Sequence, residues 1–234
     1  MIYCDFLIIG SGIVGLAIAR ELSLRFNDVK IIVLEKENNL GAHASGRNSG
    51  VIHAGFYYTD DSLKARFTRQ GNESLKNFCR SRNLKLNPCG KLVVARNESD
   101  LRGLDVLLER ARKNGVTLER ITASEAKSIE PMAKTYEYAL FSPTTASVNP
   151  LEVVSAMAKA CQENKVEIHC HTKYISRNKN KIITTRGIYQ SHYFINAAGL
   201  FADKIAKDFG FSENYYLLPF KGLYLYGSQT TPKL

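Results

Sequence analysis

The first 36 residues carry a strand–turn–helix–strand pattern that restricts the fold more than any other part of the chain. Strand-forming residues occupy positions 3–9, a helical pattern runs from Ile13 to about Arg25, and a second strand is expected at positions 30–34. This is the order of a βαβ unit, in which a helix connects two parallel strands. The first strand and the helix are separated by a turn that contains Gly10, Gly12 and Gly15. The pattern predicts an α/β fold that opens with a Rossmann-like domain.

The spacing of these glycines favours a dinucleotide site. Gly10 permits a tight turn, Gly12 lets the backbone approach a pyrophosphate, and Gly15 allows close packing of the helix. Glu35 lies twenty residues beyond Gly15, at the end of the second strand. A carboxylate there accepts a hydrogen bond from a ribose 2′-hydroxyl, which favours FAD or NAD over a 2′-phosphorylated nucleotide. The alternative is a glycine turn of purely structural use.

Composition narrows the class of protein. The chain has 234 residues, 44% of them apolar, and a net charge of +10. Its basic residues are scattered among acidic ones, so nucleic acid is not expected as a partner, whereas weak attraction to an anionic membrane stays open. The apolar run 6–19 contains three glycines and has no Lys or Arg before it, unlike a secretion signal. We expect a cytoplasmic protein with reduced thiols, either free in solution or peripheral at the inner face of the membrane.

A second glycine-rich loop occupies residues 41–58. It combines small polar residues with His43, His53 and apolar residues at 51–52 and 56–58. Such loops let backbone approach a ligand closely, and loops that follow parallel strands are where these folds bind ligands. A flexible linker is the alternative, but the apolar residues argue against it.

Four stretches, GSGIVG, LEK, HASGRNSGVIHAGFYY and INAAG, resemble the FAD-dependent oxidoreductases of the D-amino-acid-oxidase and glycerol-3-phosphate-dehydrogenase superfamily. The long third stretch, followed by SLKA, resembles the L-2-hydroxyglutarate oxidase/dehydrogenase family within it. The resemblance implies FAD as the cofactor. The residues then expected near FAD are Gly10, Gly12, Gly15, Glu35, Lys36, Ser45, Arg47, Asn48, Ser49, Gly50, Ala198 and Gly199. His43 is expected to be structural or a neighbour of the cofactor.

The resemblance also implies a domain organisation: a Rossmann-like FAD-binding domain with an inserted mixed-sheet substrate domain. We assign residues 1–82 and 146–212 to the FAD-binding domain, 83–145 to the substrate-domain insertion, and 213–234 to the start of a returning substrate-domain segment. Members of this superfamily are longer, so we expect a chain truncated at its carboxyl end, and a complementing chain is one partner left open.

Local patterns predict the elements in between. Ser62 caps a helix at 63–82, a second helix at 99–114 stops at Gly115, and a third starts at Pro150. His169 and His171 are expected to share one strand face, towards solvent rather than in a metal site. The remaining strands are expected at 84–86, 91–95, 116–121, 136–142, 166–170, 172–177, 181–185 and 216–226.

The reaction implied by the resemblance is oxidation of a 2-hydroxy acid, L-2-hydroxyglutarate to 2-oxoglutarate, with hydride transfer to flavin N5. His53 is the candidate for the base that takes the hydroxyl proton, since histidine titrates near neutral pH. A flavin-orienting hydrogen bond or a covalent flavin link are its alternatives. Lys221 is the candidate cation for the substrate dianion. Arg47 is a second candidate, although its position in a phosphate-facing loop suits it to binding the cofactor instead.

Other functions stay open. A related flavoenzyme would act on glycerol 3-phosphate or a secondary amine, and an NAD-dependent enzyme would share only the first motif. A truncated or split-enzyme fragment would bind FAD weakly and have no independent activity. Oxygen, a quinone and an electron-transfer protein all remain as electron acceptors.

Overall fold

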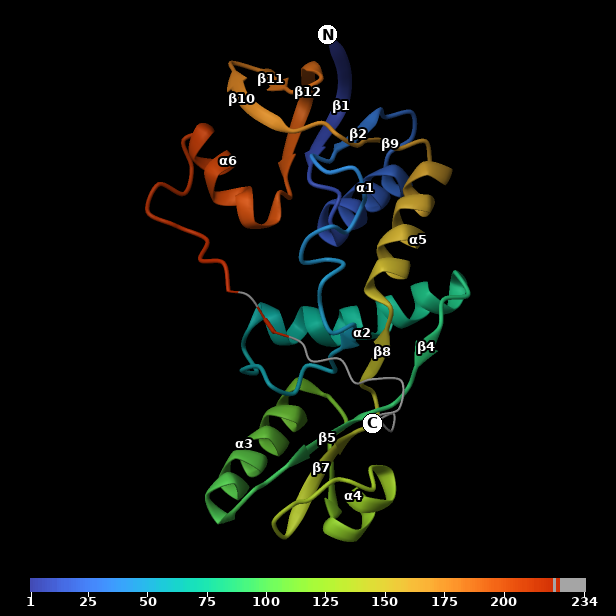
Figure 1. Ribbon diagram of the computed structural model, residues 1–234, viewed down its shortest axis with the longest axis vertical. Coiled ribbons are helices and arrows are strands. Elements are labelled where there is room, and N and C mark those ends of the chain that lie inside the picture. The colour runs from blue at the N-terminus through green and yellow to red at the C-terminus, as the bar shows by residue number, and fades with distance from the viewer. Residues whose placement is uncertain (221, 224–234) are drawn as a thin grey trace. The chain divides into compact units, whose positions relative to one another are not determined.

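The computed structural model describes residues 1–220, 222 and 223, and these form two compact units (Figure 1). Met1–Asn48 and the described residues from Pro150 onward make the first unit. Ser49–Asn149 make the second.

The first unit is built on a six-stranded sheet in the order β10-β11-β12-β1-β2-β9. Strands β1, β2, β9 and β12 run parallel, while β10 and β11 extend the sheet through antiparallel pairs. The strands are β1 (Ile2–Ile9), β2 (Ile31–Leu34), β9 (Glu167–His169), β10 (Tyr174–Asn178), β11 (Lys181–Thr184) and β12 (Gly187–Asn196). The helices are α1 (Ile13–Arg25), α5 (Pro150–Glu163), a 3₁₀ turn η1 (Gly199–Phe201) and α6 (Ala202–Asp208). The predicted α/β class with a Rossmann-like sheet is confirmed.

The core of this unit explains why its central strands are apolar throughout. All four residues of β2 are buried, as expected for a strand covered on both faces. Leu7 and Ile9 of β1 pack with Ile205 of α6. Helices α1 and α5 lie side by side in Figure 1, and the Cys161 thiol contacts the Leu16 carbonyl at 3.2 Å.

The second unit contains two small antiparallel sheets, β3-β8-β4 and β5-β7-β6. Its strands are β3 (Val51–Ile52), β4 (Leu86–Asn87), β5 (Lys91–Val94), β6 (Glu119–Thr122), β7 (Tyr138–Ser142) and β8 (Ala146–Val148). Its helices are α2 (Leu63–Ser81), α3 (Glu98–Asn114) and α4 (Ala123–Ile129). Ser62 caps α2 by accepting a hydrogen bond from Ala65 N at 3.1 Å, and Gly115 ends α3 with a left-handed φ of 62°, as predicted.

The bounds of the compact units differ from the predicted domain bounds at 82/83 and 145/146. The reason lies in α2, which hydrogen-bonds to residues on both sides of that predicted division. Asn72 donates to the carbonyls of Ile52 and Thr144, and Arg69 donates to the Asn114 carbonyl. The structure therefore groups residues 49–82 with 83–149. The assignment of FAD-binding and substrate roles to these stretches stays a prediction.

Some expected strands were wrong in detail. A strand was expected at 216–226, but the described residues of this stretch, 216–220, 222 and 223, form no strand. Phe220 in this stretch is 92% exposed, so it does not pack on a sheet. Strand β9 ends at His169, and His171 follows in a left-handed conformation with φ 54°, so the two histidines do not share a strand face. The strand expected at 116–121 begins later, at Glu119.

Within the part of the chain that the structure describes, no helix has the length and apolar character needed to cross a bilayer.

The five cysteines are unpaired, and burial raises the pKa of the Cys4 and Cys161 thiols to about 11.

A candidate dinucleotide site at the ends of the parallel strands

Three parallel strands of the first unit end side by side. Ile9 of β1 is in register with Leu34 of β2 on one side and with Asn196 of β12 on the other. The chain leaves these strands at Gly10, Glu35 and Ala197, which consequently lie at one edge of the sheet. The carboxyl edge of parallel strands, between neighbours reached by different connections, is where open α/β folds bind ligands.

The three glycines of the first turn are required by different contacts. Gly10 has a φ of 104°, and a Cβ there would lie 2.4 Å from the Ala197 carbonyl oxygen. A Cβ on Gly15 would lie 1.9 Å from the Gly10 carbonyl oxygen. Gly12 is different, because among the described residues its Cβ would meet only the Ser45 hydroxyl, at 3.0 Å. Gly10 and Gly15 are thus fixed by packing of the chain on itself, whereas the space beside Gly12 suits a ligand.

The second glycine-rich loop provides a hydrogen-bond acceptor to the amino end of α1. Ser45 Oγ accepts a hydrogen bond from Ile13 N at 2.9 Å, while Gly12 at the N-cap position has no side chain to do so. Asn48 stabilises this loop by donating to the carbonyls of Ala44 and Ser45, both at 3.0 Å, and Arg47 is exposed. The first turn of α1 contains no acidic residue. Its positive dipole end therefore suits a phosphate, as the glycine pattern predicts.

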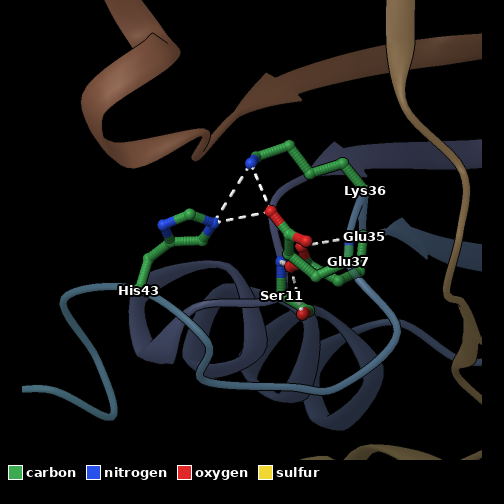
Figure 2. A network of polar contacts seen from close by, with 5 residues as sticks. All are labelled: Ser11, Glu35, Lys36, Glu37 and His43. Atoms are coloured by element: carbon green, nitrogen blue, oxygen red, sulfur yellow. Dashed lines mark hydrogen bonds and ion pairs between the residues drawn. The ribbon is translucent and has the colours of Figure 1, made fainter.

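Glu35 is buried, with 8% of its surface exposed, and its carboxylate is held by the chain. Oε2 accepts hydrogen bonds from the backbone N and hydroxyl of Ser11, at 3.1 and 2.6 Å. Oε1 accepts one from Glu37 N at 3.0 Å. Figure 2 shows Ser11 and Glu37 on either side of this carboxylate. Glu35 therefore lies at the predicted place with its orientation fixed.

Lys36 belongs to a second polar cluster beside Glu35. Figure 2 shows the side chains of Lys36 and His43 both directed at the Glu37 carboxylate, with Oε1 at 2.5 Å from Lys36 Nζ and 2.9 Å from His43 Nε2. These hydrogen bonds, chiefly the one from Lys36, lower the pKa of Glu37 to about 2. Lys36 Nζ also lies 4.7 Å from the centre of the Phe201 ring. Lys36 thereby connects the loop after β2 to η1, instead of standing free to meet a phosphate.

The INAAG stretch, residues 195–199, ends in a turn that lies against the first glycine turn. Ala197 and Ala198 pack at the position where Gly10 would carry a Cβ. Asn196 holds the turn, because its Oδ1 accepts from Ala198 N at 3.3 Å and its Nδ2 donates to the Ala202 carbonyl at 2.8 Å. Gly199 has a φ of 54° and open space beside it. The sheet therefore brings together Gly10, Gly12, Gly15, Glu35, Lys36, Ser45, Ala198 and Gly199.

Four predicted residues do not belong to the described part of the first unit. Ser49, Gly50 and His53 belong to the second unit, where the Gly50 carbonyl accepts from Val148 N at 2.9 Å. Lys221 lies outside the described residues.

His53 follows β3 and is exposed, although partial desolvation, aided by the positive charge of Lys91, lowers its pKa. Its backbone carbonyl accepts from Asn72 Nδ2 at 3.0 Å. Asn114 holds the same loop further along by donating to the carbonyls of Gly55 and Tyr58, at 3.1 and 3.0 Å.

Sequence reasoning missed four of these residues: Ser11, Glu37, Asn72 and Asn114. The two asparagines did leave a signal, because each lies at a buried position of an amphipathic helix, where an uncharged polar residue needs partners.

A sheet with four parallel strands, a glycine turn after the first, a buried acidic residue after the second and a further small-residue turn beside the first defines a dinucleotide-binding domain. The model of the FAD dependent oxidoreductase family (DAO) matches residues 5–233, and the chain belongs to this family. FAD is the cofactor of this family, and the side-chain-free backbone at Gly12, the amino end of α1 and the fixed Glu35 carboxylate fit it.

Relatives and solved structures agree with this family. The chain is 37% identical to L-2-hydroxyglutarate dehydrogenase of Escherichia coli K12 over 94% of its length and 53% of the relative. It is 35% identical to the human mitochondrial L-2-hydroxyglutarate dehydrogenase, over 94% of this chain and 51% of that protein. The chain thus spans about half the length of the curated relatives it matches.

Among solved structures, L-alpha-glycerophosphate oxidase from Mycoplasma pneumoniae with FAD bound superposes with a TM-score of 0.80. It is 27% identical, over 88% of this chain and 57% of that one. Glycine oxidase from Geobacillus kaustophilus shares the fold, with a TM-score of 0.82 at 21% identity over 91% of this chain and 60% of that one.

Proposed function

We propose that this chain binds FAD and takes part in the oxidation of L-2-hydroxyglutarate to 2-oxoglutarate. The observation that carries the proposal is the 37% identity to an L-2-hydroxyglutarate dehydrogenase along 94% of the chain, combined with a site that fits FAD. FAD, when bound, supplies the hydride acceptor for the hydrogen on C2 of the substrate.

The chain's own residues would bind and orient the cofactor and move one proton. The pyrophosphate would bind at Gly12, Ser45 and the amino end of α1. A ribose hydroxyl would donate a hydrogen bond to Glu35. His53 is proposed as the base that takes the proton from the substrate hydroxyl as C2 loses its hydride. Because its pKa is lowered, His53 is neutral at pH 7 and able to accept this proton. A flavin-orienting hydrogen bond and a covalent flavin link remain its alternative roles.

The substrate carries two carboxylates, so the proposal also needs cations. Lys221 is proposed for this role and Arg47, exposed in the loop beside α1, is the second candidate. A quinone or electron-transfer protein as electron acceptor, contact with an anionic membrane, and a chain that supplies the remaining half of the relatives' length stay predictions.

The visible absorption spectrum of the purified chain, before and after anaerobic addition of L-2-hydroxyglutarate, tests the proposal. We expect a bound-flavin spectrum that bleaches with this substrate and not with its D-enantiomer. Flavin that stays oxidised with L-2-hydroxyglutarate would contradict the proposed reaction while leaving FAD binding intact.

A second candidate function is oxidation of glycerol 3-phosphate. The superposition with L-alpha-glycerophosphate oxidase at 27% identity favours it, as does the resemblance of the glycine motifs. Bleaching by glycerol 3-phosphate in the same cuvette, with none by L-2-hydroxyglutarate, would establish this alternative. A secondary amine such as proline belongs in the same substrate panel.

A further inference from the structure

Ser11 is the middle residue of the Gly10–Gly12 turn, and its side chain does something that the glycine pattern does not require. It is fully buried, and both its backbone N and its hydroxyl donate to the same oxygen of Glu35, Oε2. The hydroxyl contact, at 2.6 Å, is in the range of strong hydrogen bonds to a carboxylate. Figure 2 shows this hydroxyl directed at Glu35.

The Glu35 carboxylate has little capacity left to accept hydrogen bonds, and that capacity lies on one of its two oxygens. An ionised carboxylate offers about four lone-pair positions, two on each oxygen. The two donors from Ser11 fill those of Oε2, and Glu37 N fills one on Oε1. Among the described residues this leaves one acceptor direction, on Oε1. The buried carboxylate can therefore accept one further hydrogen bond, at Oε1. The position of Oε1 depends on Ser11, because Ser11 holds the other oxygen, Oε2.

We propose that the Ser11 hydroxyl is a positioning residue for cofactor recognition, which presets Glu35 to accept a single hydroxyl of the adenosine ribose of FAD, the 2′-hydroxyl. The proposal deepens the proposed function, since it rests on FAD occupying this site. Ser11 acts through Glu35 and does not itself contact the ribose. Without its hydroxyl, Oε2 loses its shortest hydrogen bond, and the carboxylate can turn or bind water in place of the ribose.

Equilibrium binding of FAD to the chain after removal of its flavin tests this role without any turnover assay. The dissociation constant is measured for the unsubstituted chain, Ser11→Ala, Glu35→Gln and the double variant, by quenching of flavin fluorescence. Each is measured with FAD and with the analogue that lacks the 2′-hydroxyl on its adenosine ribose. Ser23→Ala is the matched control, because Ser23 lies in α1 and its hydroxyl donates to the Arg20 carbonyl, at 2.8 Å, within the same helix.

For FAD, we expect Ser11→Ala to weaken binding about tenfold, as for loss of a hydrogen bond to a charged group, and Ser23→Ala to leave it unchanged. The double variant should bind no more weakly than Glu35→Gln alone, because Ser11 acts only through that carboxylate. With the 2′-deoxy analogue, the unsubstituted chain should bind more weakly than with FAD, and Ser11→Ala should add no further loss.

Several outcomes would overturn the role. Equal weakening of FAD and of the analogue by Ser11→Ala would make Ser11 a structural residue of the turn, as would fully additive effects in the double variant. Equal binding of FAD and its 2′-deoxy analogue by the unsubstituted chain would remove the ribose contact, and this measurement needs no variant to fold. A chain that binds no FAD also overturns the proposal, since the contact uses only residues of this chain. Tight FAD binding without bleaching by substrate would instead contradict the proposed reaction alone.

Discussion

At the scale of single residues, the candidate site depends on which glycines have room for a Cβ atom and on the pKa of His53. Gly12 and Gly15 belong to one motif, yet a Cβ on Gly15 would overlap the Gly10 carbonyl at 1.9 Å, whereas one on Gly12 meets only the Ser45 hydroxyl at 3.0 Å. A Cβ on Gly15 would therefore conflict with backbone, whereas one on Gly12 would press only on a side chain that can move, a distinction that the motif does not contain.

This difference predicts opposite results for two alanine substitutions. Gly15→Ala should destabilise the chain by about 1–3 kcal/mol or more, as for overpacking of a tightly packed position. Gly12→Ala should keep the thermal midpoint near that of the unsubstituted chain and reduce FAD retention. Circular dichroism melts and the ratio of flavin to protein absorbance measure both. Gly71→Ala in α2, where a Cβ meets nothing within 4 Å, is the control and should not destabilise. A folded Gly15→Ala chain with a normal melt would contradict the packing argument.

A second residue-scale prediction concerns the titration of His53. Desolvation and the charge of Lys91 lower its pKa, so its neutral form persists below pH 6.5, the ordinary value. If His53 is the base, kcat/KM should fall on the acid side only as pH drops below about 6.5. The folded state binds this proton less readily than the unfolded chain, so His53 should lower stability as pH falls through 6.5 towards its folded pKa.

Nuclear magnetic resonance titration of the histidine ring protons measures this pKa directly. Lys91→Gln should raise the pKa of His53, because it removes the positive charge that opposes protonation. Arg96→Gln is a control in the same unit, since Arg96 is paired with Asp100 at 3.0 Å. A pKa for His53 at or above 6.5 in the unsubstituted chain would contradict its assignment as a base neutral through desolvation.

At the scale of elements, helix α2 does more than cover a sheet. Asn72 lies on its buried side, and its amide nitrogen is within 3.0–3.2 Å of three carbonyl oxygens, those of His53, Ile52 and Thr144. Residues 52 and 53 lead out of β3, and residue 144 lies between β7 and β8. One helix position thus joins two loops that the family resemblance assigned to separate domains.

Asn72→Ala should therefore destabilise the second unit by about 1–3 kcal/mol, because buried carbonyl groups lose their donor. It should also speed amide exchange in the loop that contains His53. Asn77→Ala is the matched control and should change stability little, because Asn77 is exposed on the same helix and its side chain accepts from Arg80 at 3.0 Å. Hydrogen exchange and urea unfolding give the two readouts. Equal effects of the two substitutions would show that Asn72 has no special role.

At the scale of the whole molecule, the described residues of the second unit form one continuous stretch, Ser49–Asn149, whose two ends meet within its own sheet. Val51 pairs with Ser147, and Val148 N donates to the Gly50 carbonyl at 2.9 Å. The unit also has its own core around Leu104, Tyr138 and Leu140. Such a stretch has the properties of a domain that can fold alone.

We therefore expect residues 49–149, produced separately, to fold cooperatively, with a single thermal transition and dispersed amide resonances. Residues 83–145, the predicted insertion, are the control and should be less stable, because they lack α2 and the hydrogen bonds of Asn72. If the shorter stretch folds as well as the longer one, the predicted division after residue 82 describes the domain better than the observed units do.

Residue types and their spacing were enough to predict most local elements and the class of site. Glycine spacing placed the turn after β1, the distance to Glu35 placed an acidic residue at the end of β2, and Ser62 and Gly115 marked helix ends. These features depend on backbone conformations of residues near one another in the chain, which residue types report directly.

Which distant residues come together at the site depends on the tertiary fold. The hydrogen bond from Ser11 to Glu35 spans 24 positions, that from Ile13 to Ser45 spans 32, and the contact of Gly10 with Ala197 depends on β12 pairing beside β1. The same holds for Asn72, whose partners lie up to 72 positions away. Each such contact follows from strand order and helix packing, which arise from the burial of many apolar side chains at once and leave no fixed spacing in the sequence.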